Sequence, residues 1–265
     1  MRFSRSTRWV ASLLGVFALI QSNADAQNAP KSSGLPEGKV VEGNPEGGLP
    51  YRVHLPETAT AQKPCRLVVW LHPSGGSGNE MVERMAPTFL KQGFALLVIT
   101  NKQWAAWTSE EGQKLLERTL PDAGKIPGVS ATKPTLMGFS AGGQLALELY
   151  WADCLKYGGL VLDAAYPIDL GTYAQGRADP HALPKDPAIQ KVPFFVLVGD
   201  QDGGSQLWKK VEPEWKQARI PLTIRYVAGR RHEWLFGGSE TEALGQWLKE
   251  IALGKIPGQN PDKKP

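Results

Sequence analysis

The chain has 265 residues, a formal net charge of +4, 42% hydrophobic and 21% charged residues, which is typical of a globular domain and excludes a coiled coil, a collagen or a disordered chain. Two cysteines, without a CxxC motif or a histidine pair at metal spacing, exclude a small disulfide-rich scaffold and a zinc site. The basic excess is small and not clustered, so no nucleic-acid partner is expected. We also expect no metal and no cofactor.

Residues 1–26 have the pattern of a cleaved signal peptide. Three arginines within the first eight residues precede the uncharged apolar run Trp9–Ile20, and Ala24-Asp25-Ala26 matches the small-x-small pattern of a signal peptidase site. The apolar run is well short of the ~20 residues that span a bilayer, so no membrane anchor is expected after cleavage. The mature protein is therefore expected to be exported, to the periplasm or to the medium.

The remainder of the chain divides by composition. Residues 27–48 are rich in Gly, Pro, Asn and Ser and predict a flexible linker, with ordered structure starting near Pro50. Residues 254–265 have the same character and predict a disordered tail. No repeat is visible, so residues 49–253 are predicted to form a single domain.

Within this domain, short apolar runs alternate with segments of helical period, which is typical of βα units. The predicted strands cover residues 51–55, 66–71, 94–100, 135–137, 159–162, 194–198 and 222–227. The predicted helices cover residues 79–92, 110–120, 141–151, 207–217 and 240–251. The pattern predicts the α/β class, with a mostly parallel sheet, helices on both faces, and ligands at the carboxyl ends of the strands.

The segment Gly138-Phe139-Ser140-Ala141-Gly142 joins a predicted strand directly to a predicted helix. A serine at the apex of so sharp a turn has a strained backbone, and glycine two residues to either side avoids a steric collision. The turn raises the Ser140 hydroxyl above the sheet and aims the helix N-terminus at the same point. GxSxG also occurs by chance, as a turn that only packs a helix on a sheet, but this strand–turn–helix context favours a nucleophile.

A serine nucleophile needs a base, and the sequence has four histidines. His54 lies inside a predicted strand, His72 follows a strand and is expected to shape the adjacent loop, and His181 lies in a proline-rich loop. His232 follows the last predicted strand. It is therefore the candidate base.

The base in turn needs a carboxylate to fix its tautomer and stabilise its cation. The predicted strand 194–198 ends in Gly199-Asp200-Gln201-Asp202. Asp202 is preferred because it lies further from the strand end and can reach the base loop, whereas Asp200 suits a turn hydrogen bond. Asp163, after the preceding strand, is the third choice. The order Ser140, Asp202, His232 places each group after a strand.

The glycine-rich loop His72-Pro73-Ser74-Gly75-Gly76-Ser77-Gly78 follows the predicted strand 66–71. It lacks the Lys-Ser/Thr that closes a phosphate-binding loop, so it is a candidate for binding an oxyanion. Pro73 has no N–H, which leaves the amides of Ser74 or Gly75 as donors. The second donor is expected to be the amide of Ala141.

Residues 50–252 resemble the α/β-hydrolase fold. Four segments carry the resemblance, namely Leu71-His72-Pro73-Ser74-Gly75-Gly76, Gly138-Phe139-Ser140-Ala141-Gly142-Gly143, Gly199-Asp200-Gln201-Asp202 and Arg231-His232-Glu233-Trp234. They look like segments of exported esterases of the polyhydroxybutyrate-depolymerase-like, feruloyl-esterase-like and dienelactone-hydrolase-like kinds. The resemblance implies a Ser140–Asp202–His232 triad and hydrolysis of carboxylic esters. It departs at Pro73, where the family usually has glycine, and this leaves the first oxyanion donor open.

The topology that the resemblance implies places Cys154 near the rim opposite the catalytic one, where the strand after Cys65 begins. Export implies an oxidising compartment, in which two cysteines often pair. A Cys65–Cys154 disulfide is therefore a hypothesis, which a Cα separation above about 7 Å would exclude.

Several aromatic residues lie in loops that the fold would place near the site, and each of them has ordinary packing as its alternative role. The candidates for contact with substrate are Trp104, Trp107, Tyr166 and Trp234. Such a wall would suit an aromatic acyl group or a sugar ring.

Three functions remain open. The first is a monomeric serine carboxylic-ester hydrolase that acts on a small-molecule or polysaccharide-linked ester through an acyl-serine intermediate. The second is a serine peptidase of the same fold, although the mature chain has no room for the gating domain that large oligopeptidases of this type carry. The third is an exported binding protein that kept the fold without catalysis.

Overall fold

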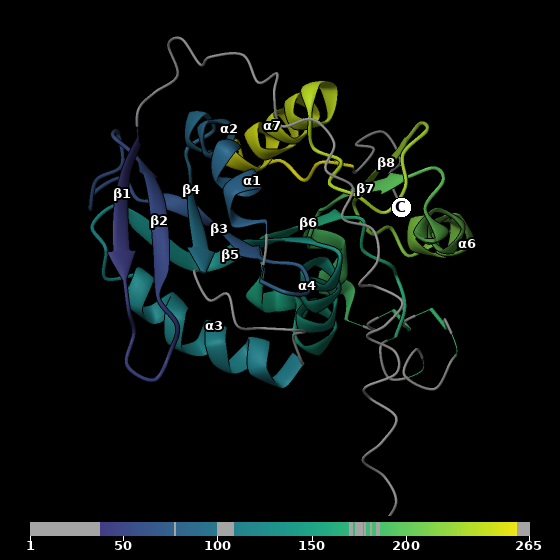
Figure 1. Ribbon diagram of the computed structural model, residues 1–265, viewed down its shortest axis with the longest axis horizontal. Coiled ribbons are helices and arrows are strands. Elements are labelled where there is room, and N and C mark those ends of the chain that lie inside the picture. The colour runs from purple at the N-terminus through teal and green to yellow at the C-terminus, as the bar shows by residue number, and fades with distance from the viewer. Residues whose placement is uncertain are drawn as a thin grey trace, which may run out of the picture. The chain divides into compact units, whose positions relative to one another are not determined.

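The structure is a computed structural model that describes residues 38–76, 78–99, 109–169, 172, 177, 179–180, 182–183 and 186–258. The predicted signal peptide, Trp104 and Trp107 lie outside these residues. Everything described belongs to one compact unit, residues 35–265. Its centre is an eight-stranded sheet in the order β1-β2-β4-β3-β5-β6-β7-β8, with helices on both faces (Figure 1).

The strands are β1 (Gly38–Gly43), β2 (Tyr51–Pro56), β3 (Cys65–Leu71), β4 (Phe94–Ile99), β5 (Val129–Phe139), β6 (Gly159–Asp163), β7 (Phe194–Gly199) and β8 (Leu222–Val227). The helices are α1 (Asn79–Arg84), α2 (Ala86–Lys91), α3 (Ser109–Ala123), α4 (Ala141–Ala152), α6 (Gly203–Gln217) and α7 (Gly238–Ala252), with short 3₁₀ turns η1 (Cys154–Lys156) and η2 (Pro187–Lys191). Strands β3 to β8 pair in parallel, whereas β2 pairs antiparallel with both β1 and β4.

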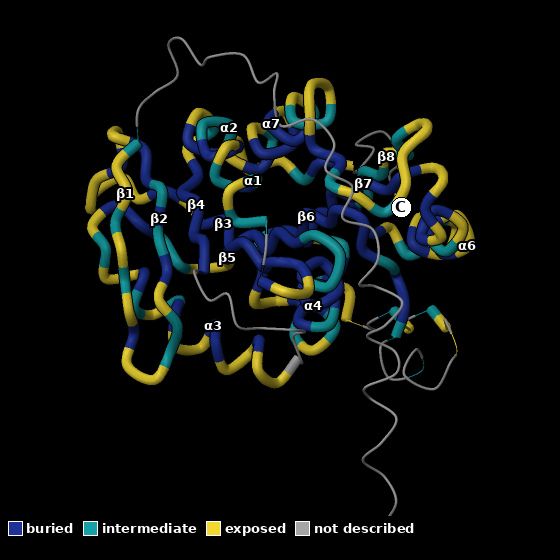
Figure 2. Tube along the Cα trace, viewed as in Figure 1, coloured by how far each residue is buried: buried dark blue, intermediate teal, exposed yellow. Residues whose placement is uncertain are grey.

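The central strands are buried on both faces, as expected for a parallel sheet covered by helices (Figure 2). Successive side chains of β3 point to opposite faces. Leu67 and Val69 join the core with α3, α4 and α6. Val68 and Trp70 join the core with α1, α2 and α7. The long apolar runs predicted as strands therefore form the middle of a three-layer domain, as predicted.

The structure corrects the predicted linker, because residues 38–43 form β1 rather than an irregular segment. This strand pairs along its whole length with β2. It lies at the edge of the sheet and is only partly buried, so its side chains lack the alternation that predicts a strand. Residues 254–258 of the predicted tail are also ordered, with Pro257 buried and the Lys255 amide donating to the Glu250 carbonyl oxygen at 3.0 Å.

Two predicted elements have different bounds in the structure. The helix expected over 79–92 is broken at Met85 into α1 and α2, and Pro87 lies in the first turn of α2. Proline is tolerated there but not in a helix interior, because its ring collides with the carbonyl four residues earlier. Strand β5 begins at Val129, which pairs with Cys65 ahead of a β-bulge between Arg66 and Val68.

The predicted Cys65–Cys154 disulfide is wrong, since both residues are buried free thiols. Cys65 begins β3, and Cys154 lies in η1, which leads into β6. Strand β5 runs between β3 and β6, so the strand that Cys65 begins and the strand that follows η1 are two strand spacings, roughly 10 Å, apart. Disulfides need Cα atoms within about 7 Å. Burial raises the pKa of both thiols.

Candidate active site

Ser140 occupies the turn between β5 and α4, with φ 53° and ψ −119°. This conformation is strained for a residue with a Cβ atom, and such positions typically cost about 1–3 kcal/mol. A Cβ atom on Gly138 would overlap the backbone of Gly142, and one on Gly142 would overlap the carbonyl oxygen of Leu71. Both glycines are therefore required for this turn. The Ser140 amide donates to the Asp163 carbonyl oxygen at 2.9 Å, which ties the turn to the end of β6.

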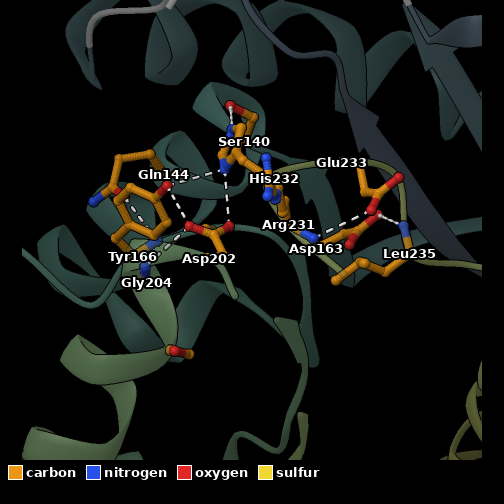
Figure 3. Close-up of polar contacts among 12 residues, drawn as sticks. Ser140, Gln144, Asp163, Tyr166, Asp202, Gly204, Arg231, His232, Glu233 and Leu235 are labelled. Carbon is orange, nitrogen blue, oxygen red and sulfur yellow. Dashed lines mark hydrogen bonds and ion pairs between the residues drawn. The ribbon is translucent and has the colours of Figure 1, made fainter. Parts of the chain in front are cut away.

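The structure brings Ser140, His232 and Asp202 together in series (Figure 3). The Ser140 Oγ lies 2.8 Å from His232 Nε2, and His232 Nδ1 lies 3.0 Å from Asp202 Oδ2. The His232 side chain is 30% exposed, whereas that of Asp202 is 1% exposed. A solvent-accessible imidazole thus links a hydroxyl to a buried carboxylate, which is the arrangement that activates a serine nucleophile.

Three hydrogen-bond donors surround the Asp202 carboxylate. The Gly204 amide donates to Oδ1 at 3.0 Å and caps helix α6, and the Tyr166 hydroxyl donates to the same oxygen at 2.7 Å. His232 donates to Oδ2. Burial alone would raise the pKa of Asp202, but the hydrogen bonds from His232, Gly204 and Tyr166 outweigh it and lower the pKa. Asp202 is therefore ionised at neutral pH.

The other two candidate acids have different partners. Asp200 Oδ1 accepts from the Gly229 amide at 2.8 Å, which is the turn bond expected for it. Asp163 is fully buried, and its Oδ2 accepts from the Leu235 amide at 3.2 Å. Desolvation raises the pKa of Asp163 well above its ordinary value. The structure therefore favours Asp202 as the partner of His232.

The glycine-rich loop lies beside the Ser140 turn, because a Cβ on Gly142 would meet the carbonyl oxygens of Leu71 and His72. His72 Nδ1 donates to the Pro73 carbonyl oxygen at 2.7 Å, so this buried histidine shapes the loop, as expected. The Gly76 amide donates to the same oxygen at 3.2 Å.

The predicted oxyanion donors lie in two segments, the glycine-rich loop and the start of α4. In the loop, Ser74 and Gly75 are exposed. Ala141 is the first residue of α4, where the helix provides no acceptor for its amide. The Ala141 amide therefore lies at the N-terminus of α4, directly after Ser140, whereas a donor role for Ser74 or Gly75 stays a prediction.

Two of the four aromatic candidates for substrate contact lie within the described residues, and they have different surroundings. Trp104 and Trp107 lie outside the described residues. Trp234 packs edge-on against Trp70, with ring centroids 5.7 Å apart, and against Phe139, at 6.0 Å, so it lies against the core. Tyr166 lies at the site, but its hydroxyl contacts Asp202 and His232. Its hydroxyl thus joins the acid and the base, and its predicted contact with substrate stays a prediction.

Two neighbours of the site were not predicted. Phe139 stacks on the His232 ring at 5.8 Å between centroids, and Gln144 lies one helical turn after Ser140. The Gln144 side chain accepts from the Tyr166 amide at 3.3 Å and donates to the Ile168 carbonyl oxygen at 2.9 Å. The spacing of four residues from Ser140 could have indicated Gln144, because residues i and i+4 share a helix face.

Within the residues that the structure describes, no cluster of three or more His, Cys, Asp or Glu side chains is arranged to hold a metal ion. Among those same residues, no helix has the length and apolar character needed to cross a membrane.

No protein-family model and no curated protein matches this sequence, but solved structures match it in fold. A ferulic acid esterase has a TM-score of 0.64 at 16% identity, over 82% of this chain and 98% of that chain. Carboxyl esterase 2 from the mycorrhizal fungus Tuber melanosporum has a TM-score of 0.62 at 15% identity, over 85% and 89%. A dienelactone hydrolase-like promiscuous phosphotriesterase from metagenomic libraries has a TM-score of 0.57 at 17% identity, over 82% and 98%.

Identities this low show the fold and not the activity. The chain has the α/β-hydrolase fold, as the resemblance implied. An α/β hydrolase enzyme from a deep-sea metagenome library also matches this fold, with a TM-score of 0.58 at 18% identity, over 82% of this chain and 99% of that chain. The carboxyl ends of β5, β6, β7 and β8 lead into the segments that carry the site residues, which are Ser140, Tyr166, Asp202 and His232 in that order.

Proposed function

We propose that this protein is a serine hydrolase that cleaves carboxylic esters through an acyl-Ser140 intermediate. The observation that carries the proposal is the continuous chain from Ser140 Oγ to His232 and Asp202, at 2.8 and 3.0 Å, on a strained turn between a strand and a helix. The similar folds of a ferulic acid esterase and a carboxyl esterase support it.

Each group then has a defined step. His232 Nε2 accepts the Ser140 proton as Oγ attacks the ester carbonyl carbon, and Asp202 stabilises the imidazolium that forms. The Ala141 amide and an amide of Ser74 or Gly75 stabilise the oxyanion, and such a donor is typically worth about 3–4 kcal/mol. His232 then protonates the departing alcohol. A water molecule, deprotonated by His232, hydrolyses the acyl-Ser140 ester and releases the acid.

We test this proposal by labelling with a fluorophosphonate and by turnover of a p-nitrophenyl ester and a peptide anilide. The expected result is one label on Ser140, ester turnover and little anilide turnover. The variant Ser140→Ala should abolish labelling and turnover. Ser239→Ala, on an exposed serine at the start of α7 that bonds to Glu240, is the matched control and should retain both.

The outcomes separate the alternatives. Faster turnover of the anilide than of the ester would favour a peptidase. Binding of esters without labelling at Ser140 would favour a non-catalytic protein and contradict the proposal.

We further propose that residues 1–26 direct export and that the mature protein acts as a monomer. The three early arginines, the apolar run and the small-x-small site support export. Mass spectrometry of the protein from the periplasm or medium should find an N-terminus at Gln27. An intact N-terminus on a protein retained inside the cell would contradict it.

A further inference from the structure

Tyr166 is held in the site by its backbone as well as by its side chain. It lies two residues after Ala164, which has φ 49° and donates its amide to the Leu197 carbonyl oxygen at 3.0 Å. Gln144 accepts from the Tyr166 amide and donates to the Ile168 carbonyl oxygen, so the segment is fixed to helix α4. A non-glycine residue with positive φ, such as Ala164, persists only where the surroundings enforce it.

The ring of Tyr166 lies on the first turn of α6. A Cβ atom on Gly204 would overlap this ring, so the second residue after the Asp202 cap must be glycine for the tyrosine to reach the site. The ring also makes an edge contact with the His232 imidazole, with centroids 5.6 Å apart, while Phe139 stacks on the imidazole at 5.8 Å. The imidazole of His232 is therefore confined by both Tyr166 and Phe139.

The hydroxyl of Tyr166 bridges the acid and the base (Figure 3). It lies 2.7 Å from Asp202 Oδ1 and 3.0 Å from His232 Nδ1. Since the ionised carboxylate only accepts hydrogen bonds, the tyrosine proton goes to Asp202. The His232 Nδ1 proton then points at Asp202 Oδ2 and at the phenol oxygen together, which leaves Nε2 unprotonated to accept from Ser140.

We infer that Tyr166 is a positioning residue, which acts through Asp202 and His232 to hold the carboxylate plane and the Nδ1–H tautomer of the imidazole. This inference rests on the proposed function. Gly204 provides a second donor to Asp202 Oδ1, so loss of the phenol hydroxyl loosens the carboxylate without freeing it. A hydrogen bond to a charged group has a strength that corresponds to a rate effect of roughly 10- to 100-fold.

The test compares Tyr166→Phe with Tyr226→Phe. Tyr226 is a matched control because its hydroxyl also donates to a carboxylate, Glu212 Oε2 at 3.0 Å, away from the site. Tyr166→Phe should lower kcat about 10- to 100-fold with KM nearly unchanged, and Tyr226→Phe should leave both unchanged. In an Asp202→Asn background, Tyr166→Phe should have little further effect on kcat, because the acceptor through which it acts is altered.

A spectroscopic readout does not depend on turnover. The His232 Nδ1 proton should give a far-downfield ¹H resonance that shifts in Tyr166→Phe and stays in place in Tyr226→Phe. An unchanged resonance, or an equal loss of kcat in the Asp202→Asn background, would overturn the inference. If the wild-type protein is not labelled at Ser140 but the resonance still shifts in Tyr166→Phe, the proposed function alone would be refuted.

Discussion

Replacing glycine by alanine should have opposite effects on stability at two buried helical glycines, Gly245 and Gly142. Replacing glycine by alanine within a helix gains up to about 1 kcal/mol from backbone propensity. At Gly245, in α7, the new Cβ would lie 3.5 Å from Thr88 Cγ2 and 3.9 Å from Gln92 Nε2, which are ordinary contacts. Gly245→Ala should therefore stabilise the protein by about 0.5–1 kcal/mol.

At Gly142 the Cβ would overlap the Leu71 carbonyl oxygen and lie 2.7 Å from that of His72. These are backbone atoms at the end of the central strand β3, and Leu71 is paired with Gly138, so they have little freedom to move. Overpacking costs typically reach about 3 kcal/mol. After the propensity gain, Gly142→Ala should lose about 2 kcal/mol of stability.

Urea unfolding, monitored by far-UV circular dichroism, measures the free energy of unfolding of Gly245→Ala and of Gly142→Ala. Ester turnover should survive Gly245→Ala and fall in Gly142→Ala, because a shifted α4 moves the Ala141 amide. The reasoning is refuted if Gly142→Ala is as stable as Gly245→Ala, since the loop after β3 would then not be in contact with the turn.

Three further predictions concern the site. Ser140→Ala and His232→Ala should each lower kcat about 10⁶-fold and the double variant little more, because the groups act as a unit; additive losses in single-turnover assays would contradict this. Asp202→Asn should cost about 10⁴-fold in kcat through the wrong tautomer, while Asp200→Asn retains turnover; the reverse ranking would identify the other acid. Neutral Asp163 stabilises the native state below the ordinary carboxyl pKa, and this stabilisation is lost as the pH rises toward its raised native pKa. Urea unfolding at pH 5 and pH 8 should show that Asp163→Asn becomes more stable relative to wild type at pH 8; a difference independent of pH would count against the assignment.

Much of the site could be predicted from the sequence because its signals are local. The turn around Ser140 needs glycine at fixed spacing, and a carboxylate and an imidazole each follow an apolar run. The strands β3, β4, β6 and β7 were equally clear, since strands buried on both faces are apolar over most of their length.

Other features depend on contacts between residues far apart in the chain, and no local pattern encodes them. Strand β1 exists because β2 supplies its hydrogen bonds. Cys65 and Cys154 are free thiols, and β5 runs between the strand that Cys65 begins and the strand that follows Cys154. The local sequence did not identify Tyr166 as the residue that joins Asp202 to His232. The ring reaches that position only because β6, α4 and α6 meet around it and Gly204 leaves the space. The glycine spacing around Ser140 is a local steric requirement of one segment. The contact of Tyr166 with Asp202 and His232 joins three segments, and it forms only when the whole sheet and its helices have assembled.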